Sequence, residues 1–173
     1  MISVVLPTYN RAHVLGRAID SVLEQTYSEW ELIIIDNHSS DQTDYLIRNY
    51  HNSKIKLYKT NNDGNIAKSR NLGISHSQGE LIAFLDSDDW WNPRKFEYSL
   101  KYLQTYNADV VYHDLYKVNS KKQNKYFKKI KTRNLISPIF KDLLQNGNAI
   151  ANSSVVVKKQ LLEKIGLISE DQE

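Results

Sequence analysis

The stretch LIAFLDSDDWWNP, residues 81–93, sets five apolar residues directly before an acidic and polar run. A short apolar run bounded by turn-forming residues is typical of a buried strand in a parallel sheet. Carboxylates at the end of such a strand lose hydration, and a ligand, a metal ion or a helix terminus must compensate the free-energy cost of that loss. The stretch therefore predicts a core strand that carries acidic side chains to a functional edge of the fold.

Segments typical of strands and of helices alternate on both sides of this stretch. Strands are predicted at residues 2–7, 31–36, 55–59, 81–86 and 109–113. Helices are predicted between them, at residues 14–23, 42–50, 66–76 and 93–106. Ser39, Ser40 and Asp41 are candidate N-caps of the second helix, and Pro93 suits the first turn of the fourth. This alternation is the pattern of βαβ units, so we expect an α/β, Rossmann-like fold with a mostly parallel central sheet flanked by helices.

Length and composition restrict the architecture further. A chain of 173 residues favours a single domain, residues 1–173, in which a helix at 138–146, a strand at 153–157 and a helix at 159–165 complete the pattern. No apolar run reaches the length of a membrane span, and the N-terminus lacks the basic region and cleavage site of a signal peptide. We therefore expect a cytoplasmic protein. The absence of cysteine excludes disulfides and thiolate zinc sites.

Residues 117–133 form a basic segment in a chain of formal net charge +3. The segment has no acid, and its cations are Lys117, Lys121, Lys122, Lys125, Lys128, Lys129, Lys131 and Arg133. A solvated hairpin or loop is the simpler interpretation. The alternative is an anionic partner: a membrane surface, at the inner face of the plasma membrane, or a phosphate-bearing acceptor. No recognised nucleic-acid module surrounds the segment, so no nucleic-acid partner is expected.

Asp86, Ser87, Asp88 and Asp89 follow the apolar run. In an extended chain alternate side chains share a face, so the carboxylates of Asp86 and Asp88 would repel each other unless a cation lies between them. Oxygen ligands of this kind suit Mg²⁺ or Mn²⁺, with water and phosphate oxygens completing the shell. The alternative is a helix N-cap cluster in which Asp89 caps the helix behind Pro93.

Polar residues after other strands are expected at the same edge, because ligands bind outside the carboxyl ends of parallel strands. Asp36 can accept hydrogen bonds from a base or ribose, or it can cap the next helix. Lys68 and Arg70 lie at the start of a helix, where they would attract phosphate or form a solvated face. Thr8 and Tyr9 offer a hydroxyl and an aromatic ring to a base.

Other nucleotide-binding schemes lack their motifs in this chain. There is no G-x-x-x-x-G-K-[ST] and no G-x-G-x-x-G after the first strand, so neither a P-loop nor a dinucleotide fold is expected. Trp90 and Trp91 fit two interpretations, stacking on a sugar or packing against the helix behind Pro93.

Two stretches resemble one enzyme family in order and spacing. VVLPTYNRAHVLGRAIDSVLEQTYSEWELIIIDNHSSDQT, residues 4–43, and NNDGNIAKSRNLGISHSQGELIAFLDSDDWWNPRKF, residues 61–96, resemble the nucleotide-sugar-binding half of family-2 glycosyltransferases, which have the GT-A fold. NSSVVVKKQLLEKIGLISED, residues 152–171, is similar to the region leading toward the acceptor side. The resemblance implies a nucleotide-sugar-binding half at residues 1–115 and a partial acceptor side at 116–173, truncated at its C-terminus.

The resemblance also implies an activity and a set of site residues. It implies a metal-dependent transferase that moves a sugar from a nucleotide-sugar donor, a UDP-sugar, to a glycan or lipid-linked acceptor in bacterial-type cell-surface polysaccharide synthesis. The cofactor would be Mn²⁺ or Mg²⁺ on Asp88, with Asp86 and Asp89 as further candidate ligands. Arg70 would approach the pyrophosphate. The nucleotide-sugar-binding set is Pro7, Thr8, Tyr9, Asp36, Lys68, Arg70, Asp86 and Ser87.

The catalytic base is the point at which the chain departs from the family pattern. The family reaction is commonly inverting, and a carboxylate deprotonates the acceptor hydroxyl. That base usually belongs to a Glu-Asp pair followed by an aromatic residue and a Trp-Leu-Arg-like run, whereas this chain stops at Glu173. Either Asp171 is the base or the base lies beyond the chain end; the second is favoured, because ISED fits the preceding segment better. We therefore expect metal-dependent binding of nucleoside diphosphate but poor sugar transfer by these residues.

Two other functions stay open at this point. A module that holds a sugar nucleotide without turning it over would fit a missing base. A nucleotidyltransferase also uses paired carboxylates on an α/β sheet, but it would require a phosphate loop rich in glycine and lysine, which PTYNRAHVL lacks.

Overall fold

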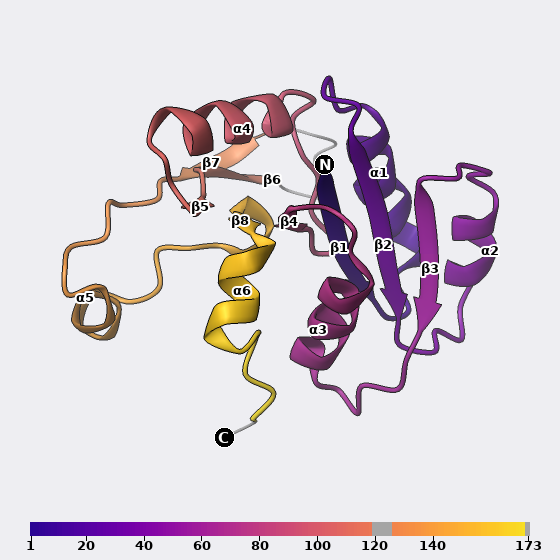
Figure 1. The fold of residues 1–173 in the computed structure, drawn as a ribbon. Helices are drawn as coiled ribbons and strands as arrows, with labels where there is room; N and C mark the ends of the chain where they lie inside the picture. Colours follow the sequence, from indigo (N-terminus) through magenta and orange to yellow (C-terminus); the bar gives the residue numbers. More distant parts are fainter. Residues whose placement is uncertain (119–125, 172–173) are drawn as a thin grey trace.

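A computed structural model describes residues 1–118 and 126–171 of the chain (Figure 1). Its centre is a six-stranded sheet in the order β3-β2-β1-β4-β8-β5, with a separate two-stranded sheet of β6 and β7. Strands β1 to β4 are mutually parallel, and β8 runs antiparallel to both β4 and β5. The predicted α/β architecture with a mostly parallel sheet is therefore confirmed.

The elements follow the predicted alternation. The first half comprises β1 (Ile2–Thr8), α1 (Ala12–Leu23), β2 (Trp30–Asp36), α2 (Thr43–Arg48), β3 (Ile55–Lys59), α3 (Ile66–His76), β4 (Leu81–Phe84) and α4 (Lys95–Thr105). The second half comprises β5 (Val110–Val111), β6 (Leu115–Val118), β7 (Tyr126–Ile130), α5 (Ile139–Asn146), the 3₁₀ helix η2 (Asn152–Ser154), β8 (Val156–Lys158) and α6 (Lys159–Ile165).

Three strand boundaries differ from the prediction where the sheet meets η2. Strand β4 ends at Phe84 instead of residue 86, β5 contains only two residues, and β8 begins at Val156 instead of residue 153. The apolar pattern could not indicate this, because residues 152–154 turn as a 3₁₀ helix. Ser153 Oγ accepts a hydrogen bond from the backbone N–H of Asp86 at 3.0 Å, so a side chain replaces the strand ladder there.

The predicted caps of α2 are only partly correct. The helix is shorter than predicted, and its N-cap position, Gln42, makes no side-chain capping bond. Asp41 serves this end of the helix instead: its Oδ1 accepts from the Thr43 N–H, and its Oδ2 accepts from the Ala12 N–H, each at 3.0 Å. The Asp41 carboxylate therefore links the first turns of α1 and α2.

The sheet is covered on both faces. Residues of β1 alternate between two clusters: Val4 and Leu6 pack with α1 and α4, whereas Val5 packs with α3 and α6. Every residue of β1 and β2 is buried, as expected for central strands of a parallel sheet. Helix α3 approaches β1 closely, because a Cβ on Gly73 would lie 2.4 Å from Val5 Cγ1. A glycine is therefore required at this contact.

The basic segment forms the predicted hairpin in its described part. Strands β6 and β7 pair antiparallel, with Leu115 opposite Ile130 and an irregularity between Lys117 and Val118. Lys121, Lys122 and Lys125 lie outside the described residues. The chain then leads to α5, which Figure 1 shows at the side of the molecule away from β3.

Candidate functional site

The candidate site lies at the carboxyl ends of β1, β2 and β4, as the sequence predicted. These strands lie side by side in the sheet, and β1 and β2 end in register, with Thr8 opposite Asp36. The loop of residues 85–92 follows β4, and α3 begins beside the same edge. Parallel strands bring their C-terminal residues to a common edge, so topology alone gathers side chains far apart in sequence.

Thr8 and Tyr9 differ in what they can offer to a ligand. Thr8 is 5% exposed, and its Oγ1 has no hydrogen-bond partner among the described residues. Tyr9, next in the chain, is 56% exposed. Pro7 is buried within β1. A buried hydroxyl without a partner is costly, so Thr8 is a polar group for which a ligand would be a natural partner.

Asp36 is the last residue of β2, and its carboxylate binds the loop that follows the strand. Its side chain is fully buried, and Oδ1 accepts from both the backbone N–H of Ser39, at 3.1 Å, and the Ser39 hydroxyl. Ser39 Oγ in turn accepts from the N–H of Asn10 at 2.8 Å. The carboxylate therefore fixes the β2 loop against the β1 loop, and its predicted contact with a base stays a prediction.

Arg70 and Asp86 form an ion pair that the sequence did not predict. Arg70 Nη2 lies 2.9 Å from Asp86 Oδ1, and Asn152 Nδ2 donates to the same oxygen at 3.1 Å. Arg70 Nε is buried and has no partner within the described part of the chain. Arg70, which was predicted to bind pyrophosphate, thus compensates the charge of Asp86. A metal ion between Asp86 and Asp88 is therefore not needed to relieve the repulsion of their carboxylates.

Asp88 is the exposed acid of the loop, while Ser87 is buried. The backbone carbonyl of Asp88 accepts from Arg17 Nη2 at 3.3 Å, and the Arg17 guanidinium lies 3.5 Å from the centre of the Trp90 ring. Arg17 therefore anchors the loop from α1 and leaves the Asp88 carboxylate facing solvent. Trp90 stacks on a cation in this arrangement.

Asp89 and Trp91 belong to the interior of the loop. Burial raises the pKa of Asp89, and the charges of Asp88 and Asp86 raise it further, whereas a hydrogen bond with Ser153 lowers it. Trp91 is 5% exposed, donates from Nε1 to the Ser153 carbonyl at 2.7 Å and packs edge-on against Phe96. The packing interpretation is therefore correct for Trp91, and Asp89 is bound to η2 instead of capping α4.

A buried lysine supports η2 from behind. Lys95 Nζ donates to the Ser154 carbonyl at 3.0 Å and to His113 Nε2 at 2.8 Å. Burial lowers the pKa of Lys95 to about 7. Burial and the neighbouring Lys95 charge lower the pKa of His113 to about 4, and His113 Nδ1 lies 2.8 Å from the Asp114 carbonyl, which can only accept. The histidine is therefore neutral, with its proton on Nδ1.

Two predicted residues lie at the margin of this arrangement. Lys68 Nζ is 3.5 Å from Asp63 Oδ2, and both side chains are exposed. Asp171 is exposed and contacts Ser169, whose hydroxyl lies 3.4 Å from Asp171 Oδ2. Sequence reasoning missed Arg17, Asn152 and Ser153, for which position in the chain gave no signal.

The acidic side chains fit a cation that takes few ligands from protein. Across residues 1–118 and 126–171, no three Asp, Glu, His or Cys side chains are grouped to hold a metal ion. Asp88 is nevertheless an exposed carboxylate in the loop that follows β4. Mg²⁺ and Mn²⁺ accept one or two carboxylates plus water and phosphate oxygens, so this donor set is sufficient for such an ion.

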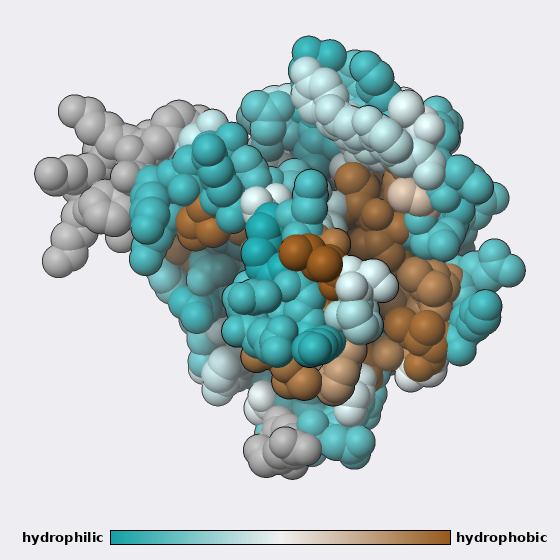
Figure 2. All heavy atoms as spheres, turned by 90° about the vertical axis from the view of Figure 1, so that its left-hand side faces the viewer, coloured by the Kyte–Doolittle hydropathy of each residue, from teal (hydrophilic) through white to brown (hydrophobic). Residues whose placement is uncertain are grey.

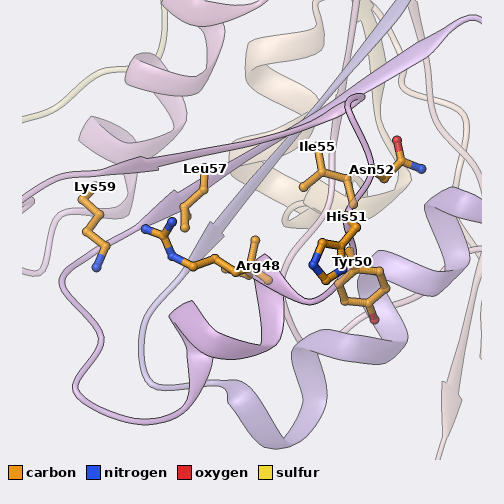
Figure 3. Close-up of a pocket in the computed structure, with 8 residues that line it drawn as sticks. Arg48, Tyr50, His51, Asn52, Ile55, Leu57 and Lys59 are labelled. Atoms are coloured by element: carbon orange, nitrogen blue, oxygen red, sulfur yellow. The ribbon is translucent and has the colours of Figure 1, made fainter.

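A pocket of ≈ 310 Å³ lies elsewhere, between α2 and β3 (Figure 3). Its lining includes Tyr50, Ile55 and Leu57, and none of the predicted site residues contributes to it. The Tyr50 hydroxyl is occupied, since it donates to Asp20 Oδ1 at 2.9 Å or to the Gly16 carbonyl at 3.1 Å. The candidate site therefore lies at the strand ends and not in this pocket.

Comparisons with known proteins identify the family of the chain. The sequence model described as Glycosyl transferase family 2 matches residues 3–166. The chain is 37% identical over 112 residues to UDP-Glc:alpha-D-GlcNAc-diphosphoundecaprenol beta-1,3-glucosyltransferase WfgD of Escherichia coli, covering 65% of this chain and 44% of WfgD. It is 32% identical over 129 residues to glycosyltransferase GlyG of Streptococcus pneumoniae, covering 73% of this chain and 43% of GlyG. The chain thus spans less than half the length of these two relatives.

Solved structures show the same fold. TarS 1-349 of S. aureus in complex with UDP-GlcNAc superposes with a TM-score of 0.77 at 22% identity, over 95% of this chain and 47% of that one. Mannosyltransferase PcManGT of Pyrobaculum calidifontis, in complex with GDP-Man and Mn²⁺, gives a TM-score of 0.68 at 20% identity, over 98% of this chain and 48% of that one. These likenesses confirm the predicted GT-A glycosyltransferase fold.

Proposed function

The chain belongs to glycosyl transferase family 2, and on that premise we propose that it transfers a sugar from a UDP-sugar donor to a glycan or lipid-linked acceptor. The observation that carries the proposal is the pair of buried, unpartnered donors at one sheet edge. Within the described residues Thr8 Oγ1 and Arg70 Nε have no hydrogen-bond partner. A nucleoside diphosphate has acceptor oxygens that suit both donors.

The residues divide into a base side and a phosphate side. Thr8 and Tyr9 offer a hydroxyl and an exposed ring beside the loop that Asp36 fixes, which supports binding of the uracil base there. Arg70 and Asp86, paired at 2.9 Å, lie on the phosphate and ribose side. The ion pair with Asp86 holds the Arg70 guanidinium in place, so its remaining N–H groups can donate to an incoming diphosphate.

A divalent ion, Mn²⁺ or Mg²⁺, would be held by Asp88, which is exposed at this edge. When bound, such an ion supplies positive charge that stabilises the diphosphate leaving group. Arg17 keeps the Asp88 backbone in place by a hydrogen bond of 3.3 Å to its carbonyl. Asp86 is compensated by Arg70 and Asn152, so we assign the metal to Asp88 first.

The transfer itself would proceed with inversion. The acceptor hydroxyl would attack the anomeric carbon and give its proton to a carboxylate, while the sugar–phosphate bond breaks and the nucleoside diphosphate leaves with the bonding electron pair. Asp171 is the candidate base among the described residues, because it is exposed and its hydrogen bonds with them are to the nearby Ser169 alone.

The acceptor side supports contact with a membrane surface. Ile139, Phe140 and Leu144 on α5 are 52%, 76% and 71% exposed. Figure 2 looks onto the side where α5 lies and shows hydrophobic residues at the surface. Lys128 and Lys131 of the basic segment are exposed as well. Apolar side chains beside cations are the pattern of interfacial binding to anionic lipid.

A lipid-linked acceptor agrees with this surface. The relative WfgD is named for action on a diphosphoundecaprenol-linked sugar, and we propose an acceptor of that class here, for cell-surface polysaccharide synthesis. No helix in the described residues has the length and apolarity needed to cross a membrane. The exposed apolar residues of α5 and the exposed lysines of the basic segment lead us to propose peripheral contact through these two parts.

Calorimetric titration with UDP, with and without Mn²⁺, tests the proposal. We expect Mn²⁺-dependent binding that Asp88→Ala abolishes. Asp171→Ala is the matched control, since it removes another exposed acid and should leave UDP binding unchanged. Equal binding by Asp88→Ala and wild type would exclude the assigned metal site, and robust sugar transfer by these residues that is lost in Asp171→Asn would identify Asp171 as the base.

A further inference from the structure

The C-terminal segment, residues 167–171, lies along α3 and is bound there by a side-chain amide. Asn71 Nδ2 donates to the Ile168 carbonyl at 2.8 Å and to Glu170 Oε1 at 2.7 Å. Asn71 Oδ1 accepts from the Ile168 N–H at 3.1 Å. One asparagine thus pairs with both backbone groups of Ile168, as a neighbouring strand would, and it also binds the next acid.

A second asparagine binds the same segment at the first turn of α3. Asn65 Oδ1 accepts from the Ala67 N–H at 2.9 Å and so caps the helix. Asn65 Nδ2 donates to the Glu170 carbonyl at 2.7 Å. Asn65 is 8% exposed. Both ends of this amide are therefore used, one for the helix and one for the C-terminal segment.

Helix α3 connects this segment with the donor site. Arg70 precedes Asn71 in the chain, and its Nη2 binds Asp86 Oδ1 at 2.9 Å. The helix is fixed against β1, since Ile74 is buried and Gly73 leaves no space before Val5. The loop of residues 85–92, here called the acid loop, is held by Arg70, and the C-terminal segment is held by Asn71, the next residue on the same helix. Helix α3 therefore sets the distance between the acid loop and the C-terminal segment.

The bonds are needed because residues 167–171 lie in no helix or strand that would order them. Gly166 ends α6 with φ 89°, and Leu167 and Ile168 are only partly buried against the α3–α6 cluster. Each hydrogen bond adds a modest net stabilisation, so the four bonds from Asn65 and Asn71 together select one position of the segment.

We propose that Asn71 and Asn65 are positioning residues that hold Ile168–Asp171 at the edge where the donor sugar would lie. The inference rests on the proposed function for the meaning of that edge. In this arrangement the Glu170 carboxylate is a tether, because it is bound to Asn71, and Asp171 is the neighbouring acid that faces solvent. The segment thereby directs the Asp171 carboxylate toward the donor edge.

Two variants separate the tether from the helix that carries it. Asn71→Leu keeps the approximate volume and removes all three Asn71 bonds. Asn65→Asp keeps the oxygen that caps α3 and removes the N–H that binds Glu170. Ser75→Ala is the matched control on the same helix, because Ser75 Oγ donates only within α3, to Leu72.

Amide hydrogen exchange of residues 168–171 reports the tether without any ligand. We expect exchange at Ile168 to rise about fivefold or more in Asn71→Leu, with a smaller rise in Asn65→Asp and no change in Ser75→Ala. Unchanged exchange in both asparagine variants would overturn the proposal.

Paramagnetic broadening by Mn²⁺ reports the position relative to the donor. With UDP and Mn²⁺, compared with UDP and Mg²⁺, the NMR signals of residues 168–171 should broaden in the wild type and broaden less in Asn71→Leu, while UDP affinity changes by less than about twofold. Binding without broadening of these signals in the wild type would refute the positioning role. Absence of UDP binding in the wild type would refute the proposed function, while the exchange comparison would still decide the tether.

Discussion

Replacing Thr8 by valine should change stability and ligand affinity in opposite directions. Thr8 is 5% exposed, and its Oγ1 is unpartnered among the described residues. A buried polar group without a partner costs about 1–3 kcal/mol, so a valine of the same shape in strand β1 should raise the free energy of unfolding of the ligand-free protein by about 1 kcal/mol. If the nucleotide bonds to this hydroxyl, the same change should weaken UDP binding by about 1 kcal/mol, or roughly fivefold.

Thr43→Val provides the matched control. Thr43 is fully buried like Thr8, but its Oγ1 donates to Asp41 Oδ1 at 2.6 Å. Its replacement should lower the free energy of unfolding by about 1 kcal/mol or more and leave UDP binding unchanged, because an existing bond is lost. Urea unfolding without ligand and calorimetric titration with UDP and Mn²⁺ measure both quantities. A Thr8→Val protein that is less stable than wild type and binds UDP with wild-type affinity would refute the reasoning.

Two further predictions concern the buried lysine and α5. Burial lowers the pKa of Lys95 from its usual 10.5 to about 7, so between these values the unfolded state binds more protons and the free energy of unfolding should rise with pH. Lys95→Met should flatten that rise in urea titrations at pH 7 and 9.5, and an equal slope in both proteins would contradict it. The double variant Phe140→Ser, Leu144→Ser should cosediment severalfold less with phosphatidylglycerol vesicles. Tyr45→Ser is the control, since Tyr45 on α2 is likewise exposed, at 66%, and its loss should not change cosedimentation. An equal loss in both proteins would exclude α5 as the contact.

Two strands of the first half could be predicted from sequence because their burial is nearly complete. Strands β1 and β2 are buried at every residue, so their continuous apolar runs indicate both their type and their length. Strand β5 is different: Val110 is 37% exposed and the strand has two residues, so its short apolar run overstated it. Strand β8 was misplaced for a related reason, since Ser153 and Ser154 are buried by turning toward the acid loop and not by pairing in the sheet.

The site could be predicted in its location but not in its pairings. The edge follows from topology, because parallel strands deliver Thr8 and Asp36 to one end of the sheet. The partner of Asp86 does not follow, since Arg70 reaches it from α3 and Asn152 reaches it from a segment 66 residues later in the chain. Such contacts depend on how helices pack on the sheet, and a single sequence has no periodic signal for that.

The acid loop depends on the second half of the chain. Strand β8 lies between β4 and β5 in the sheet, so residues 152–158 complete the framework on which the loop rests. The Ser153 hydroxyl accepts from the Asp86 N–H, and the Ser153 carbonyl accepts from the Trp91 indole N–H. Lys95 donates to the carbonyl of Ser154. Burying a lysine lowers the stability of the fold. Its hydrogen bond to η2 gives this lysine a structural role, because η2 in turn holds the loop that carries the carboxylates. The acid loop and residues 152–158 are therefore physically coupled, and loss of either the lysine or η2 should disturb the acid loop first.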